Sequence, residues 1–168
     1  MSKLLLILLL AAPALSHAQY YEQRRALSLL AGPSAGYTTF IQDAKAGAGL
    51  GGFFDLGGSL TVGDDRDEVL IMLRGGAGQG GVEGVVQGGY RSIFGDDDWQ
   101  SFFDVGAALR LFSGTWAGPR VGFGVRHALS DQLSVYGGFG LSLGFGSGLR
   151  MDAEAFTGLQ WSFLINPR

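Results

Sequence analysis

The sequence predicts an all-β fold: an eight-stranded antiparallel up-and-down transmembrane β-barrel, preceded by a cleaved signal peptide. Two observations on composition point to it. Hydrophobic residues make up 46% of the chain and charged residues only 16%, whereas soluble domains carry about 25% charged residues. After a short N-terminal apolar run, no stretch of about 18 apolar residues remains that could form a spanning helix. Only helices and closed barrels satisfy every backbone polar group in lipid, so such an exported chain is expected to form a barrel.

The third observation is the alternation of apolar and polar residues, which is clearest between Gln132 and Phe145. Successive side chains of a strand point to opposite faces, so this alternation predicts a strand with one apolar and one polar face. The segment has the length of about 9–11 residues that a membrane-spanning strand needs. The apolar series consists of Leu133, Val135, Gly137, Phe139, Leu141, Leu143 and Phe145.

The N-terminus carries the features of an export signal. Lys3 precedes an apolar run from Leu4 to Ala12, and small residues stand at Ser16 and Ala18, the two positions that a signal peptidase reads. The run is shorter than the ~20 residues of a spanning helix. We therefore expect a signal peptide over residues 1–18 and one barrel domain over 19–168. The sequence has no cysteine, which excludes a lipoprotein anchor and disulfides.

Four strands are predicted in the first part of the barrel domain. Apolar residues alternate with small or polar ones over residues of about 26–37, 46–62, 68–78 and 82–94. Pro33 lies inside the first of these strands and removes a hydrogen-bond donor from its ladder. Turn-forming residues separate the second strand from the third at 63–67 and end the fourth strand at 95–98; both turns are acidic.

Four more strands are predicted at about 99–112, 119–128, 132–145 and 150–165. An even number of strands places both ends of the chain on one side of the membrane. Because an exported chain arrives from the periplasm, the turns at 63–67, 95–98 and 129–131 are expected on the periplasmic side, and the other four connections outside.

The polar face of the strands is expected to point inward. Alternation alone does not decide this, because a soluble lipid-carrying barrel has the same period with apolar residues inside. However, the polar face carries fewer charges than the roughly quarter to third that a water-exposed surface has. A narrow lumen would force inward charges into pairs, because a buried unpaired charge is very costly. The sequence thus predicts a plugged interior rather than an open pore. The predicted network contains Asp55, Arg74, Glu83, Arg91, Asp104, Arg110, Arg120, Arg126, Asp152 and Glu154.

Aromatic residues on the apolar face fall near strand ends, as the interfacial girdles of membrane barrels require. The predicted interfacial residues are Tyr37, Phe94, Trp99, Trp161 and Phe163.

No catalytic, cofactor-binding or metal-binding residue is assigned. The glycine patterns at 47–52 and 76–81 match a dinucleotide fingerprint but lack the strand before and the helix after it. The acidic turns lack the calcium-loop pattern. His127 has Ser130 and Asp131 nearby, which would suit a nucleophilic site, but an interfacial histidine accounts better for its outward, periplasmic position. The formal net charge of −3 gives no reason to expect nucleic acid.

The chain resembles the small eight-stranded outer-membrane barrels of the OmpA/OmpX type over nearly all of the region after the signal. The resemblance rests on the export signal, the eight alternating strands, the acidic turns and the aromatic last strand from Trp161 to Ile165. It implies location in the outer membrane of a Gram-negative envelope, contact with outer-membrane lipids, and handling by periplasmic chaperones and the barrel assembly machinery. Some barrels of this size are lipid A deacylases with a His-x-Ser pair, but His127-Ala128-Leu129-Ser130 does not match that motif.

Three functions follow from these observations. The first is a monomeric, non-enzymatic barrel with a structural or surface-interaction role in the envelope. The second is a lipid-modifying outer-membrane enzyme. The third is a secreted soluble barrel that binds a hydrophobic ligand.

Overall fold

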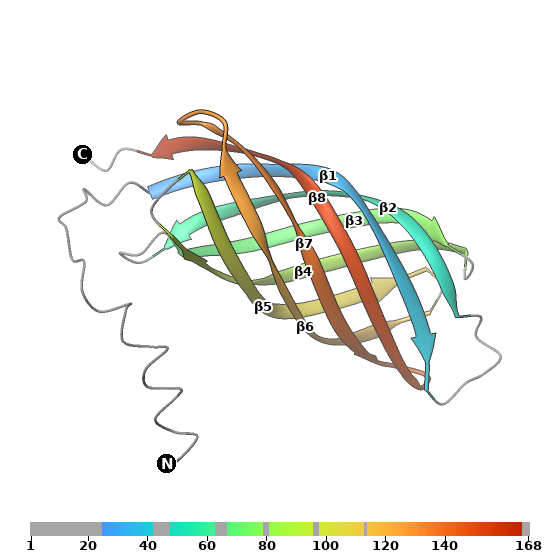
Figure 1. Cartoon of the computed structure of the whole chain (residues 1–168). Coiled ribbons are helices and arrows are strands. Elements are labelled where there is room, and N and C mark those ends of the chain that lie inside the picture. The colour runs from blue at the N-terminus through green and yellow to red at the C-terminus, as the bar shows by residue number, and fades with distance from the viewer. Residues whose placement is uncertain are drawn as a thin grey trace, which may run out of the picture.

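The computed structural model describes residues 25–41, 48–62, 67–78, 81–95, 98–112 and 114–165, which form a closed antiparallel barrel (Figure 1). Each strand pairs with its neighbours in the sequence, and the last strand closes the barrel on the first. The strands are β1 (Arg25–Phe40), β2 (Gly49–Val62), β3 (Asp67–Gly78), β4 (Gly81–Phe94), β5 (Trp99–Leu111), β6 (Trp116–Ala128), β7 (Leu133–Phe145) and β8 (Leu149–Ile165). The eight-stranded up-and-down barrel is thus confirmed, while the predicted signal peptide lies outside the described residues.

The strand bounds differ from the predicted ones where pairing with a neighbour decides the end of a strand. β1 continues to Phe40, which pairs with Arg150 of β8. β6 begins at Trp116, three residues earlier than predicted, because Trp116 pairs with Arg110. β5 ends at Leu111, since Phe112 has a φ of 80° and cannot continue a strand.

Pro33 lies within β1 and affects only one of its two ladders. The pairing with β2 is continuous through Pro33↔Phe54. The pairing with β8 passes from Ala31↔Leu159 to Ser34↔Phe156. Because proline has no N–H to donate, an interruption on one side of β1 is the expected cost of placing it in a closed barrel.

The two faces of the wall are the reverse of those in a water-soluble protein. The buried residues are mainly polar or charged, and the exposed large residues are mainly apolar. On β1 the outward apolar surface runs from Leu27, which pairs with Phe163, to Tyr37, ten residues further on. With a rise of ~3.3 Å per residue and a tilt of about 40°, this corresponds to a band about 25 Å tall. The apolar band of transmembrane barrels has this height.

Among the residues described, none forms a helix that is long and apolar enough to cross a membrane.

The two ends of the barrel are distinguished here by the chain termini. The terminal end holds the start of β1 and the end of β8, which pair through Arg25↔Ile165, together with the ends of β2, β4 and β6 and the starts of β3, β5 and β7. The distal end holds the ends of β1, β3, β5 and β7 and the starts of β2, β4, β6 and β8. All seven connections are short, so each strand is followed directly by its antiparallel neighbour, as in a meander.

Candidate functional site

The candidate site is the barrel interior. Along each strand, alternation directs every second side chain, and with it most of the polar residues, into this interior. In the described part of the chain, equal numbers of arginines and carboxylates lie there. The arginines are Arg74, Arg91, Arg110, Arg120, Arg126 and Arg150. The carboxylates are Asp55, Glu68, Glu83, Asp104, Asp152 and Glu154. Since unpaired buried charges cost several kcal/mol each, the equal numbers are a condition for folding.

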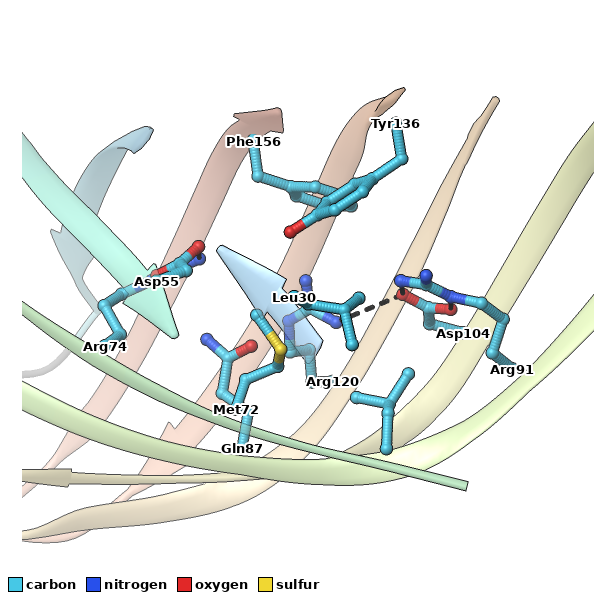
Figure 2. Close-up of a pocket in the computed structure, with 11 residues that line it drawn as sticks. Leu30, Asp55, Met72, Arg74, Gln87, Arg91, Asp104, Arg120, Tyr136 and Phe156 are labelled. Carbon is cyan, nitrogen blue, oxygen red and sulfur yellow. Dashed lines mark hydrogen bonds and ion pairs between the residues drawn. The ribbon is translucent and has the colours of Figure 1, made fainter. Parts of the chain in front are cut away.

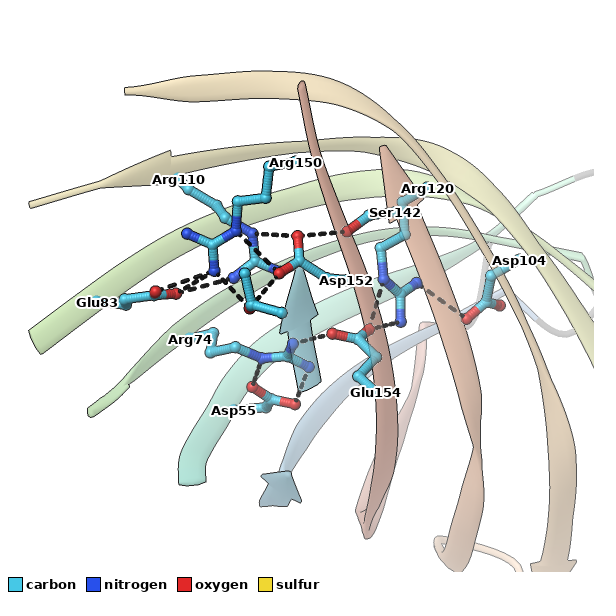
Figure 3. A network of polar contacts seen from close by, with 11 residues as sticks. Asp55, Arg74, Glu83, Asp104, Arg110, Arg120, Ser142, Arg150, Asp152 and Glu154 are labelled. Carbon is cyan, nitrogen blue, oxygen red and sulfur yellow. Dashed lines mark hydrogen bonds and ion pairs between the residues drawn. The ribbon is translucent and has the colours of Figure 1, made fainter. Parts of the chain in front are cut away.

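Four of these charges form a closed square near the distal end, here called the distal ring (Figure 3). Arg110 lies 3.1 Å from Glu83 and 3.1 Å from Asp152. Arg150 lies 2.9 Å from each of the same two carboxylates. The Thr38 hydroxyl donates to Asp152 Oδ1 at 2.5 Å and accepts from Arg150 Nη2 at 2.9 Å. Every corner of the ring therefore has two partners of opposite charge.

Six further charges alternate in sign along a continuous path, here called the central chain: Asp55, Arg74, Glu154, Arg120, Asp104 and Arg91. Its two ends are bidentate pairs. Arg74 donates to both oxygens of Asp55 at 2.6 and 2.8 Å, and Arg91 to both oxygens of Asp104 at 2.7 and 3.0 Å. Bidentate pairs fix both the distance and the plane of the guanidinium.

The middle of the central chain is held by Glu154, which accepts from two arginines (Figure 3). Arg74 Nη1 donates to one carboxylate oxygen, and Arg120 donates to the other from Nε at 2.8 Å and Nη2 at 2.6 Å. Arg120 also reaches Asp104 at 3.8 Å. The chain thus connects residues of β2, β3, β4, β5, β6 and β8 across the lumen.

Inward glycines provide the space for this packing. Gly122 of β6 pairs with Gly140 of β7. A Cβ at Gly140 would lie 2.7 Å from Glu154 Oε1 and 2.9 Å from Arg120 Nη2. A side chain at Gly140 would therefore collide with the central chain, which explains the glycine at this position on the polar face of β7.

Aromatic rings cover the faces of the arginines. The Arg91 guanidinium carbon lies 4.0 Å from the centre of the Phe102 ring, and that of Arg120 lies 5.5 Å from the Phe156 ring. The Arg150 guanidinium carbon lies 5.5 Å from the centre of the Phe40 ring. Contacts of this kind within about 6 Å are attractive, and they leave the guanidinium edge free for carboxylates.

An apolar layer lies on the terminal side of the central chain. It consists of the buried residues Leu30, Phe102, Tyr136 and Phe156, with Met72 and Ile93 packed against them. The Phe156 ring centre is 6.3 Å from that of Phe102 and 6.3 Å from that of Tyr136. This aromatic layer in the lumen was not predicted from the sequence.

A smaller polar group lies beyond the apolar layer, toward the terminal end. Arg126 pairs with Glu68 at 2.9 Å and donates to the Gln100 side-chain oxygen at 2.5 Å. Gln160 donates to Glu68 Oε1 at 2.9 Å. The inward residues of β5 show the order of the layers, since Gln100, Phe102 and Asp104 follow one another from the terminal end. The apolar layer is therefore enclosed between two charged regions.

A cavity of about 20 Å³ lies where the central chain meets the apolar layer (Figure 2). Its lining includes Arg74, Arg91 and Arg120 together with Tyr136 and Phe156. A volume of this size holds about one water molecule. It is too small for a substrate or a cofactor.

All ten charged residues predicted for the interior contribute to these groups, and two further residues do so. Arg150 is 1% exposed and belongs to the distal ring, and Glu68 is 3% exposed and pairs with Arg126. The sequence contained a signal for Arg150, because it stands two residues before Asp152 and four before Glu154, on the same face of one strand.

The five predicted interfacial aromatics are exposed on the outer wall. Phe94, Trp99, Trp161 and Phe163 lie at the terminal end, and Tyr37 lies toward the distal end. At the terminal end the Trp161 and Phe163 rings are stacked with centres 6.0 Å apart.

Trp99 stacks with the His127 ring at 4.4 Å. His127 therefore lies on the outer wall at the terminal end, with its Nδ1 3.3 Å from the backbone oxygen of Asp98.

The glycine patterns and acidic runs bring no ligand-binding residues together in the described part. Residues 76–78 end β3, and Gly81 begins β4. Within the described ranges, no three His, Cys, Asp or Glu side chains are grouped so that they could hold a metal ion. Asp67 instead accepts hydrogen bonds from the Tyr90 hydroxyl and the Ile93 backbone N–H.

No family model and no curated protein matches the sequence. The structure is similar to solved outer-membrane barrels at low sequence identity. Neisserial surface protein A matches with a TM-score of 0.70 and 12% identity over 82% of this chain and 99% of that one. The attachment invasion locus protein Ail of Yersinia pestis matches with a TM-score of 0.59 and 10% identity, over 84% and 100% of the chains.

The N-terminal β-barrel domain of Pseudomonas aeruginosa OprF matches with a TM-score of 0.55 and 13% identity, over 82% of this chain and 97% of that one. At such identities the comparisons establish the fold, which is that of a small eight-stranded outer-membrane barrel.

Proposed function

We propose that this chain is an integral outer-membrane β-barrel that is closed to ions and has a structural role in the cell envelope. The observation that supports closure is the layered interior. An ion entering from the distal end would meet the distal ring, then the central chain and then the apolar layer. The first two have all their charges paired, and the third is apolar except for the Tyr136 hydroxyl, which cannot replace the hydration shell of an ion by itself.

The closed interior also distinguishes this proposal from a soluble carrier of hydrophobic ligands. A carrier barrel keeps an apolar cavity in its lumen. Here the lumen is filled by paired charges, and the cavity of about 20 Å³ cannot hold a lipid. The outer wall, in contrast, exposes Leu141, Phe139 and Leu73, which suits contact with outer-membrane lipids.

The orientation follows from export. If residues 1–18 direct the chain through the inner membrane, the terminal end faces the periplasm and the distal end faces outward. Periplasmic chaperones and the barrel assembly machinery would then handle a monomer that closes through β1 and β8. No nucleic acid or cofactor has a role in this proposal.

A surface-interaction role is the second candidate, because Ail, an attachment protein by its name, has the same fold. Ail has also been solved in complex with the heparin analogue sucrose octasulfate. The distal connections of the present chain are short, and their sequence contains only two charged residues, Asp43 and Lys45. A polyanion needs a cluster of basic residues, so we favour the structural role over binding of this kind.

The closed interior predicts the result of a conductance measurement. The mature protein, refolded into planar lipid bilayers, should show no conductance steps. Phe102→Ala, which removes a ring from the apolar layer, should raise ion leakage. Its neighbour provides a matched control, because Phe103 points outward and Phe103→Ala removes a ring without opening the lumen. Regular conductance steps in the unmodified protein would contradict a closed barrel.

The lipid-modifying enzyme is the third candidate, and the geometry around His127 argues against it. His127 stacks on Trp99, while the Ser130 hydroxyl accepts hydrogen bonds from the backbone N–H groups of Gln132 and Leu133. In the proposed orientation both residues lie at the periplasmic side.

His127→Ala should therefore leave the acyl composition of envelope lipids unchanged. Lipid A and phospholipids would be compared by mass spectrometry in cells that express either protein at the same level, with Trp99→Ala as a control for loss of the stacked ring. If acyl groups change with the unmodified protein and this change is lost in His127→Ala alone, the enzyme hypothesis is favoured.

A further inference from the structure

Phe112 has an unusual backbone conformation for a large residue. It follows β5 directly, with a φ of 80°, and its side chain is 81% exposed. Bulky side chains rarely adopt positive φ, because the Cβ then crowds the backbone. Such a residue persists where an interaction of the side chain offsets the strain.

The Phe112 ring lies against the outer wall on the neighbouring strand. A Cβ added to Gly84 of β4 would lie 2.5 Å from Phe112 Cε2 and 2.9 Å from Cδ2. Gly84 pairs with Leu111, the last residue of β5. The positive φ therefore turns the chain so that the ring lies across the wall and covers the glycine, instead of continuing along β5.

The position of the ring complements the other aromatic residues at the distal end. Tyr37 on β1 and Phe145 on β7 are exposed there, and they lie on the same side of the barrel, separated by β8. On the other described strands, the outermost outward residues at the distal end are small or aliphatic. They are Leu50 on β2, Ala77 on β3, Val82 on β4 and Ala117 on β6. Phe112 is the aromatic residue that lies in this sector.

We propose that Phe112 is a membrane anchor that binds the boundary between headgroups and acyl chains of the outer leaflet, on the side of the barrel where the described strands carry no outward aromatic residue at their distal ends. Aromatic rings prefer this boundary. The strained φ places the ring there, and Gly84 provides the flat surface on which it rests. This inference depends on the proposed location in a membrane.

The depth of residue 112 in a bilayer tests the proposal. The sequence has no cysteine, so Phe112→Cys can be labelled with bimane in the full chain and refolded into phosphatidylcholine vesicles that carry nitroxides at known depths. Phe145→Cys marks the expected boundary, and Leu73→Cys marks the middle of the wall. Equal quenching of labels 112 and 145 by nitroxides near the headgroups supports the anchor.

The failures of the two proposals are distinguishable in this experiment. If label 112 is quenched by aqueous iodide but not by lipid nitroxides, while labels 145 and 73 behave as expected, the anchor is wrong and the membrane barrel stands. If label 73 is not quenched by deep nitroxides, the membrane location itself is wrong.

A second measurement, of stability, tests the contact between the Phe112 ring and Gly84. Phe112→Gly should lower the urea midpoint of unfolding in vesicles, although glycine adopts a φ of 80° without strain. Gly84→Ala should lower the urea midpoint as well. The midpoint of the double variant should be no lower than that of the less stable single variant, because both changes remove the same contact. Gly75→Ala is the matched control, because Gly75 pairs with Gly84 and an added Cβ there meets no atom within 4 Å. A higher midpoint for Phe112→Gly, or additive losses, would overturn the proposal.

Discussion

Arg74→Met is expected to lower the free energy of unfolding by about 3–5 kcal/mol, the usual cost of removing one partner from a buried ion pair. Arg74 holds Asp55 through two hydrogen bonds and also donates to Glu154. In the variant, Glu154 keeps Arg120, but Asp55 loses the arginine to which both of its oxygens are bonded. A buried carboxylate without a partner then opposes folding. Urea titration of the refolded protein in phospholipid vesicles would measure the loss.

Two further variants identify the cause of this loss. Adding Asp55→Asn to Arg74→Met removes the buried carboxylate charge that has lost its partner. The double variant should therefore regain much of the stability that Arg74→Met loses. Arg126→Met makes the same substitution where the arginine side chain is 15% accessible, and it should cost less because water can partly replace the arginine. An unchanged urea midpoint for Arg74→Met would contradict the central chain.

Leu141→Arg is expected to cost about 2–4 kcal/mol of stability in a bilayer, as for an arginine on the lipid face near the midplane. Leu141 lies near the middle of β7, is 53% exposed on the outer wall, and pairs with Val121 and Ala153. The guanidinium would have to enter hydrocarbon or distort the bilayer around it. The measurement is the shift of the urea midpoint in vesicles.

The matched control is Leu133→Arg on the same strand and the same face. Leu133 begins β7 and pairs with Trp161 at the terminal end, where an arginine should cost about 0–1 kcal/mol because it can reach the interface. Equal losses of stability at both positions would mean that the two residues do not lie at different depths in a bilayer. A neutral Leu141→Arg would mean that this face does not meet lipid.

Much of the fold could be predicted from the sequence because the relevant signals are local. In β7 the alternation of Leu141 and Ser142 with their neighbours identifies a strand, and repetition of this pattern gives the number of strands. The shortage of charge predicts which face meets lipid. The structure confirms the eight strands and the antiparallel closure. The signal peptide, the assembly partners and the monomeric state remain predictions.

The arrangement of the site could be predicted only in part. Alternation predicted that Arg74 and Glu154 point inward, but it could not predict that they meet, because 80 residues separate them and β3 and β8 are not neighbours. The partner of an inward residue depends on the stagger between strands and on the height at which each side chain enters the lumen. Neither leaves a local pattern in the sequence.

The sequence by itself thus determined the class of the protein: the strands, their faces and the need for balanced inward charge. The tertiary structure decided how that charge is divided into a distal ring, a central chain and the group at Arg126, and that Phe102, Tyr136 and Phe156 form an apolar layer between the last two. It also placed Phe112 on Gly84. The physical reason is that alternation is a property of one strand, whereas pairing and layering depend on how all eight strands close around a common lumen.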